Sequence, residues 1–183
     1  VFSQFLFKTL AFDPAAFEPV SQLFFISHAL VASAKLNTRT VAELAALSKA
    51  QPGTLSYSTA SVPLGVLIER MKKDAGIDMV RVPFRGGGEA VTALLSGATP
   101  VGFYGLSNVR SQLEAGSVVA LMVDGEKRSP LFPNTPTIQE ATGKEFKARS
   151  YFGLLAPART PKTATARLQT AIAAIVARDR KST

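Results

Sequence analysis

Short apolar runs alternate with amphipathic segments along the chain, and this alternation limits the possible folds more than any other feature of the sequence. The runs are rich in Val, Leu, Phe and Tyr, which is typical of buried strands. They predict strands over residues 21–25, 28–32, 55–58, 79–83, 101–104, 118–123 and 151–155. Strands separated by helices form a largely parallel sheet, and ligands bind beyond the carboxyl ends of such strands. The sequence therefore predicts an α/β fold with a ligand site at one edge of its sheet.

The predicted helices have recognisable ends. Residues 40–43 and 137–140 each read Thr-x-x-Glu, the pattern of a capping box, and Thr160-Pro161 combines an N-cap with a proline at the first helical position. Glycines are expected to end helices at Gly76, Gly97 and Gly116. Residues 124–136 form the longest irregular stretch, which we expect to wrap around the domain.

Composition narrows the classes of partner. The 183 residues include 46% hydrophobic and 19% charged residues, which supports one domain or one and a half with a sizeable core. The net charge of +8 fits nucleic acid, an anionic surface or a small anion. The basic residues are scattered and not interleaved with aromatics, which argues against nucleic acid.

Several other properties can be excluded from the residues present. The absence of cysteine excludes disulfides, thiolate metal sites and cysteine nucleophiles. The apolar stretch 23–34 is interrupted by Ser27 and His28 and is too short to span a bilayer, so no membrane-embedded segment is expected. The first residues lack a basic region and a cleavage site and do not resemble a signal peptide.

Catalytic patterns are missing. The sole histidine, His28, falls in a predicted apolar strand, where a structural role is favoured. The sequence has no HExxH, no GxSxG and no P-loop ending. Glu89 is better explained as a carboxylate at a helix start than as an acid/base partner of Asp74 or Asp78. We therefore expect neither enzymatic activity nor a metal or cofactor.

A glycine-rich segment, VPFRGGGEAVTALLSG at residues 82–97, is the most informative motif for function. It predicts a strand, a turn at Gly86, Gly87 and Gly88, and a helix whose first N–H groups and dipole favour an anion. Arg85 could make a bidentate contact to a carboxylate. The alternative is a purely structural turn, with Arg85 facing water.

A second polar loop follows the strand predicted at 55–58. Ser58, Thr59 and Ser61 precede Pro63, which marks a helix start, so that hydroxyls and amides could together bind a carboxylate. The alternative is that these hydroxyls only cap the helix. Tyr104, at the end of another predicted strand, is a candidate wall of the same site.

In order along the chain, these motifs resemble one family. FDPAAFEPVSQL, RTVAELAALSKAQPGTLSYSTAS, VPFRGGGEAVTALLSG, EAGSVVALMV, EKRSPLFPNTPTIQEATG and SYFGLLAPARTPK are similar to segments of the tripartite tricarboxylate transporter (TctC-like) substrate-binding proteins, also called Bug receptors. The resemblance implies a type II periplasmic binding fold, with two lobes that close on a small carboxylate held by amides, hydroxyls and water. It also implies a periplasmic location and delivery of the ligand to membrane transporter subunits.

The family pattern also implies an organisation into lobes. Residues 27–148 correspond to the second, ligand-binding lobe, and residues 1–26 and 149–183 to the first. The family's portion before residue 1 is absent, so we expect an incomplete first lobe, as in a fragment, a truncated gene or an incompletely recorded chain.

The chain departs from the family pattern at two places. STASVPLG replaces a glycine-containing loop, so residues 58–61 correspond to that loop by position only. Tyr104 and Pro100 stand where acidic residues are usual, which removes a partner for a ligand amino group. We therefore expect an aromatic or simple carboxylic acid, such as a di- or tricarboxylate, in preference to an amino acid.

Four functions follow in order of support. The first is a solute receptor that binds its carboxylate through Ser58, Thr59, Ser61, Arg85 to Gly88 and Tyr104. The second is a ligand-sensing module of the same fold that signals to a regulatory partner. An α/β enzyme and a nucleic-acid-binding protein are disfavoured by the missing catalytic residues and the scattered charge.

Overall fold

The computed structural model describes residues 8–59, 62–145 and 150–179. The chain forms two compact units, and each is described by itself. The central unit comprises Ser27–Arg149, and the terminal unit comprises Val1–Ile26 with Ser150–Thr183. The assignment of these units to two lobes of a receptor stays a prediction.

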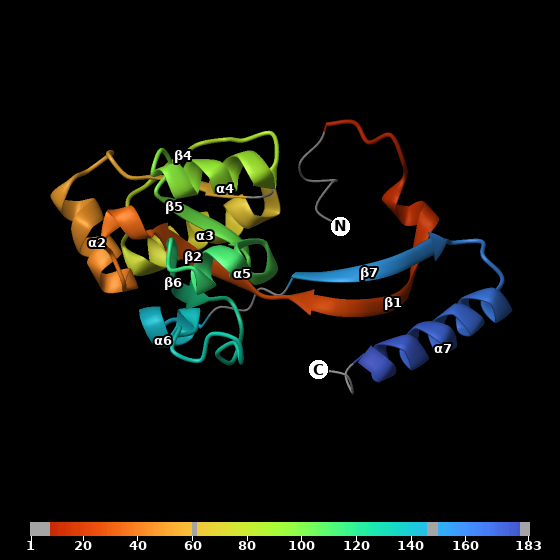
Figure 1. The fold of residues 1–183 in the computed structure, drawn as a ribbon. Helices are drawn as coiled ribbons and strands as arrows, with labels where there is room; N and C mark the ends of the chain where they lie inside the picture. The colour runs from red at the N-terminus through yellow and green to blue at the C-terminus, as the bar shows by residue number, and fades with distance from the viewer. Residues whose placement is uncertain (1–7, 60–61, 146–149, 180–183) are drawn as a thin grey trace. The chain divides into compact units, whose positions relative to one another are not determined.

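The central unit is built on a five-stranded sheet in the order β4-β3-β5-β2-β6 (Figure 1). Its strands are β2 (His28–Ser33), β3 (Ser56–Thr59), β4 (Val80–Arg81), β5 (Val101–Gly105) and β6 (Val118–Val123). Each predicted run of this unit forms a strand, but β4 is shorter than expected. Pro83 lies within the run predicted as this strand and has no N–H to donate to a neighbouring strand.

The sheet is mixed, and in this respect the prediction of a largely parallel sheet needs correction. β3 pairs in parallel with both β4 and β5, as the prediction requires. β2 lies between β5 and β6 and is antiparallel to both. The chain enters the unit directly through β2, without the crossover helix that would keep this strand parallel to its neighbours.

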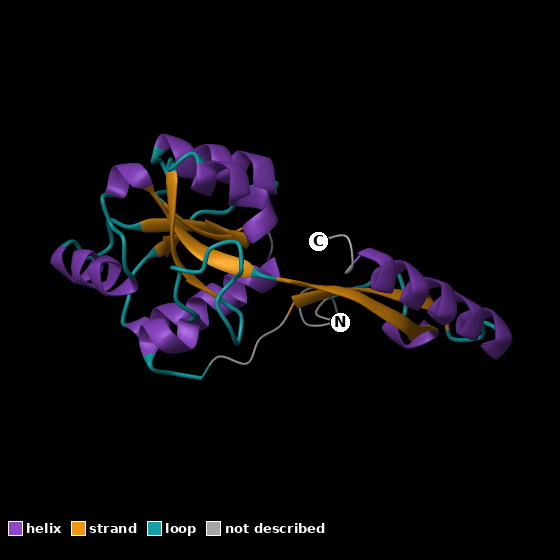
Figure 2. Cartoon of the chain, turned by 60° about the horizontal axis from the view of Figure 1, so that its bottom comes forward, coloured by secondary structure: helices purple, strands orange, loops and turns teal. Residues whose placement is uncertain are grey.

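Helices cover both faces of the sheet (Figures 1 and 2). On one face, α2 (Val41–Ala50), α3 (Val62–Ala75) and α6 (Ile138–Thr142) pack on Leu30, Tyr57 and Phe103. On the other face, α4 (Gly87–Ser96) and α5 (Leu106–Glu114) pack on Ala29, Val31 and Tyr104. β2 contributes to both clusters, and all six of its residues are buried.

The helix ends largely follow the local signals. Thr137 forms the predicted capping box with Glu140, and Thr40 accepts a hydrogen bond from the Glu43 N–H. α4 ends at Gly97 in the left-handed conformation, with φ of 86°. The loop after β6 is fixed to the unit, because Arg128 donates to the Glu140 carboxylate of α6 at 2.9 Å and Phe132 packs against the cluster under α4 and α5.

The terminal unit contains a two-stranded antiparallel sheet and one long helix. After a short 3-10 helix (η1, Pro14–Ala16), β1 (Phe17–Ile26) pairs with β7 (Ser150–Pro157), and α7 (Lys162–Asp179) follows. Gln169 Nε2 donates to the Val20 carbonyl at 2.9 Å and ties α7 to β1. The prediction of buried strands is wrong here, since Phe24 and Phe152 are more than half exposed. Within the described residues, only these two strands make up the sheet.

Candidate functional site

The carboxyl ends of four strands meet at one edge of the central sheet, as the alternation predicts. β3, β4 and β5 are parallel neighbours, and β6 runs in the same direction on the far side of β2. Because β2 is antiparallel, its amino-terminal residue, His28, lies at the same edge, opposite Gly105. This edge therefore brings together the end of β3, the loop after β4, the ends of β5 and β6, and the start of β2.

The glycine loop forms an open helix start at this edge. Gly86 is the N-cap of α4 and offers no side-chain bond to the first helical N–H groups. A Cβ on Gly86 or Gly88 would have no atom within 4 Å, and neither residue has a positive φ, so packing does not require glycine at these positions. The absent side chains leave the backbone open to an approaching ligand.

The charges around this helix start are mixed. Arg85 is exposed, and within the described part of the chain its guanidinium has no hydrogen-bond or ion-pair partner. Glu89 lies in the first turn of α4 and accepts a hydrogen bond from the Arg85 backbone N–H at 3.3 Å. The Glu89 carboxylate thus has the expected helix-start role, and it also weakens the positive field that an anion would meet.

Ser58 and Tyr104 are brought together, but in a way the sequence did not predict. Their hydroxyl oxygens are hydrogen-bonded at 2.5 Å, and both residues are 0% exposed. Burial raises the pKa of Tyr104, and the bond to Ser58 opposes that shift. Both hydroxyls therefore brace β3 against β5 beneath the edge of the sheet, in a position where neither side chain is open to solvent.

Gly102 makes this arrangement possible. The Tyr104 ring lies over the backbone of Gly102, where a Cβ would come within 2.0 Å of the ring. In register, Gly102 is the β5 partner of Ser58. A glycine at this position therefore provides the space in which the tyrosine hydroxyl reaches Ser58.

The other two hydroxyl residues predicted for the site are Thr59 and Ser61, and the structure describes only the first of them. Thr59 ends β3 at the edge of the sheet and is 9% exposed. Ser61 lies outside the described residues. The exposed part of the candidate site is therefore the loop from Arg85 to Gly88, and Thr59 is buried at the end of the neighbouring strand.

A buried pair that sequence reasoning missed occupies the same edge. Asp124 follows β6, and its Oδ1 accepts a hydrogen bond from the backbone N–H of His28 at 2.8 Å. Its second carboxylate oxygen, Oδ2, is hydrogen-bonded to His28 Nδ1 at 2.6 Å. The Asp124 N–H in turn donates to the His28 carbonyl at 3.0 Å. The structural role expected for His28 fits this pairing. The signal that could have revealed Asp124 is its position directly after a predicted buried strand.

This arrangement is suited to anion binding. The edge offers the first backbone N–H groups of α4 and an exposed guanidinium, while the buried carboxylate of Asp124 is bonded to His28. Within the residues that the structure describes, no group of three or more His, Cys, Asp or Glu side chains could hold a metal ion. Among the described helices, none combines the length and apolar character needed to cross a membrane.

Solved structures identify the class of protein to which this fold belongs. A protein described as a periplasmic transporter matches with a TM-score of 0.84 and 26% identity over 95% of this chain and 59% of its own. An R. palustris protein solved with adipate matches with a TM-score of 0.82 and 29% identity over 92% of this chain and 57% of its own. MatC from Rhodopseudomonas palustris, with bound malate, matches with a TM-score of 0.76, 29% identity and coverage of 92% and 58%. The fold is that of periplasmic solute-binding proteins.

The family follows from the sequence comparisons. The model of the tripartite tricarboxylate transporter family receptor matches residues 2–179, and the chain belongs to this family. A UPF0065 protein from the TAR-I ttuE-ttuC' intergenic region of Agrobacterium vitis is 29% identical over 91% of this chain and 49% of its own length. BugT of Bordetella pertussis is 29% identical over 78% of this chain and 44% of its own length. The chain spans about half the length of these curated relatives.

Proposed function

We propose that this chain supplies the carboxylate-binding part of a periplasmic solute receptor that delivers its ligand to a tripartite tricarboxylate-type membrane transporter. The observation that carries the proposal is the open helix start at Gly86 to Gly88, with the exposed Arg85 beside it. Membership of the receptor family and the adipate and malate in two similar structures support a small carboxylate as the ligand. The protein acts as a carrier and performs no chemical step on the acid.

In this proposal the Arg85 guanidinium and the first N–H groups of α4 bind one carboxylate of the ligand. Thr59 at the end of β3, and Ser61 two residues later in the sequence, donate hydroxyl hydrogens to the same carboxylate. Ser58 and Tyr104 act beneath the site by fixing β3 to β5. The other end of the ligand is held by the first lobe of the receptor, whose closure over the ligand completes the site.

The preference for acids without an amino group follows from Tyr104. The family resemblance implies an aspartate at this position, and the Tyr104 hydroxyl that stands there is already bonded to Ser58. A ligand ammonium group at this edge meets the exposed Arg85, and the Asp124 carboxylate is already bonded to His28, which leaves the Glu89 carboxylate in the first turn of α4 to offset the repulsion. Adipate and malate should bind more tightly than aspartate or glutamate.

Isothermal titration calorimetry with adipate and malate tests the proposal, on this chain and on a version extended to the length of its relatives. Arg85→Gln should weaken binding about 10–100-fold, which corresponds to a charge-assisted hydrogen bond of about 1.5–3 kcal/mol. Lys73→Gln removes an equal charge from an exposed position on α3 and should leave the Kd unchanged.

A second variant tests the sign of the electrostatic argument. Glu89→Gln removes the carboxylate that competes with the ligand at the start of α4, so binding should become about two- to fivefold tighter. Equal affinities of the Arg85→Gln and unsubstituted proteins, or tighter binding of aspartate than of either acid, would refute the assigned site.

A further inference from the structure

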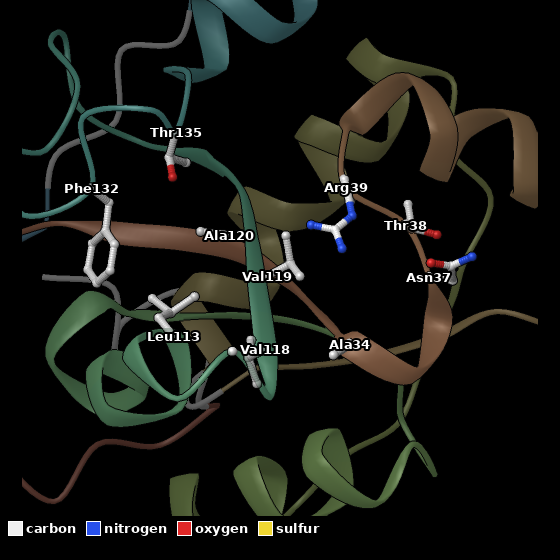
Figure 3. A pocket seen from close by; sticks show the side chains of 11 residues that line it. Ala34, Asn37, Thr38, Arg39, Leu113, Val118, Val119, Ala120, Phe132 and Thr135 are labelled. Carbon is white, nitrogen blue, oxygen red and sulfur yellow. The ribbon is translucent and has the colours of Figure 1, made fainter.

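The outer strand of the central sheet borders a pocket that the proposed function does not use. β6 is the last strand in the order β4-β3-β5-β2-β6, and Val118, Val119 and Ala120 line a cavity of about 440 Å³ (Figure 3). The cavity also involves Ala34, which follows the carboxyl end of β2. It therefore lies at the end of β2 opposite His28 and the candidate carboxylate site.

The hydrogen-bond pattern shows which backbone groups of β6 face outward. The Ala34 N–H donates to the Ser117 carbonyl at 3.0 Å, so Ala34 and Ser117 form a hydrogen-bonded pair. Hydrogen-bonded and non-hydrogen-bonded pairs alternate in an antiparallel ladder, so the next pair, Ser33 with Val118, is non-hydrogen-bonded. The N–H and C=O groups of such a pair point away from the partner strand. The Ser33 N–H does point away, because it donates to Pro100 on the opposite side. Val118, and Ala120 two residues later, therefore direct their N–H and C=O groups out of the sheet.

These outward groups form a short edge without a strand partner, in which Ala120 is half-buried and Val118 is buried. At the carboxyl end of β6, the Val123 N–H donates to the Pro136 carbonyl at 2.9 Å, and Val123 bridges Thr137 in parallel. No strand or bridge of the described chain pairs with the outer side of Val118 or Ala120. The strand has the sequence VVALMV, without the charged residues or proline that commonly protect an exposed edge.

The side chains around this edge differ on its two sides, as Figure 3 shows. On the side of Ala120, the wall is formed by Leu113 and Phe132. On the side of Val119, the Arg39 guanidinium points into the cavity. Arg39 is the only charged residue of the lining, and among the described residues its guanidinium has no carboxylate partner.

We propose that the outer edge of β6 binds an extended segment of a partner protein, in which acidic and apolar side chains alternate. Such a segment would pair its backbone with Ala120, the partly exposed residue of this edge, and so continue the sheet. Successive side chains of a strand point to opposite faces, so alternate residues would meet Arg39 on one side and Leu113 with Phe132 on the other. The acidic residues of the partner complement the one charge of the lining.

This interaction goes beyond the proposed carboxylate binding and uses different residues of the central unit. A variant that loses peptide binding should still bind adipate and malate with an unchanged Kd. Conversely, a lack of adipate or malate binding would not affect peptide binding at the β6 edge. The two proposals therefore stand or fall separately.

Fluorescence anisotropy with a short labelled peptide of alternating valine and glutamate tests the inference on the whole chain. Arg39→Gln should weaken binding by about tenfold or more, because it removes the charge-assisted contact. Lys49→Gln, at an exposed position near the end of α2, is the matched control and should not change the Kd. A peptide with lysine in place of glutamate should bind at least about tenfold more weakly.

Two further reagents test the backbone pairing itself. Ala120→Pro removes an N–H that points out of the sheet and so should abolish peptide binding with little change in melting temperature. N-methylation of the central backbone amides of the labelled peptide should also abolish its binding, and it does so without a change to the protein. Absence of binding up to about 1 mM peptide, or binding unaffected by Arg39→Gln and Ala120→Pro, would overturn the proposal. So would a concentration-dependent dimer that Ala120→Pro abolishes while the peptide fails to bind, since the edge would then serve a second copy of this chain.

Discussion

Replacement of Gly102 by alanine should destabilise the central unit through a single, well-defined clash. The new Cβ would lie 2.0 Å from Cε2, 2.7 Å from Cζ and 2.9 Å from Cδ2 of Tyr104. Since Tyr104 is fully buried among the side chains under α4 and α5, its ring can move only by disturbing that core. Such overpacking costs about 1–3 kcal/mol.

Two smaller effects accompany the clash. Displacement of the ring breaks the hydrogen bond between Ser58 and Tyr104, which contributes about 1 kcal/mol. Alanine regains about 0.5–1 kcal/mol over glycine because it loses less backbone freedom on folding. The net expectation for Gly102→Ala is a loss of about 1.5–3 kcal/mol in the free energy of unfolding.

Urea denaturation followed by circular dichroism measures this loss, and two variants isolate its cause. Gly88→Ala adds a methyl group where no atom lies within 4 Å and should change stability by less than about 1 kcal/mol. In a Tyr104→Val background, where no ring remains, Gly102→Ala should cost less than about 0.5 kcal/mol. An undiminished cost in that background would show that the ring is not the obstacle.

Three further expectations concern the same unit. Asp124→Ala leaves the buried N–H and ring nitrogen of His28 without their partner and should lower the free energy of unfolding by about 2–4 kcal/mol in urea titrations. Thr137→Ala removes the N-cap of α6 and should cost about 1 kcal/mol in the same assay, whereas Thr137→Ser should cost less. The hydrogen bond from Arg128, with that from the Thr137 N–H, lowers the pKa of Glu140 below its ordinary 4.5, so its stabilising effect is present above pH 4.5 and is lost as the pH falls through the lowered pKa. Arg128→Gln should therefore raise the Glu140 pKa in an NMR titration, and an unchanged pKa would contradict the assigned cause.

The sequence predicted the positions of the elements well because their signals are local. The capping box of Thr137 and the left-handed Gly97 depend on residues within one turn of helix. The direction of β2 could not be predicted in this way, because it is set by pairing with β5 and β6, which follow much later in the chain. The exposure of β1 and β7 likewise does not follow from their composition, which is that of buried strands.

The candidate site shows the same division between local and distant information. The glycine loop could be recognised because the turn and the helix start are adjacent in sequence. The bond between Ser58 and Tyr104 joins residues 46 positions apart, and the pair of His28 and Asp124 joins residues 96 positions apart. No local pattern distinguishes a hydroxyl that faces a ligand from one that faces a neighbouring strand.

The central position of β2 has a consequence for how the molecule exchanges hydrogen with solvent. All six residues of β2 are buried, and a strand lies on each side of it, so its amides are shielded in both directions within the sheet. Such amides exchange only when the surrounding structure opens as a whole. The slowest deuterium uptake in the central unit should therefore occur in β2, and its rate would report the free energy of global unfolding of that unit.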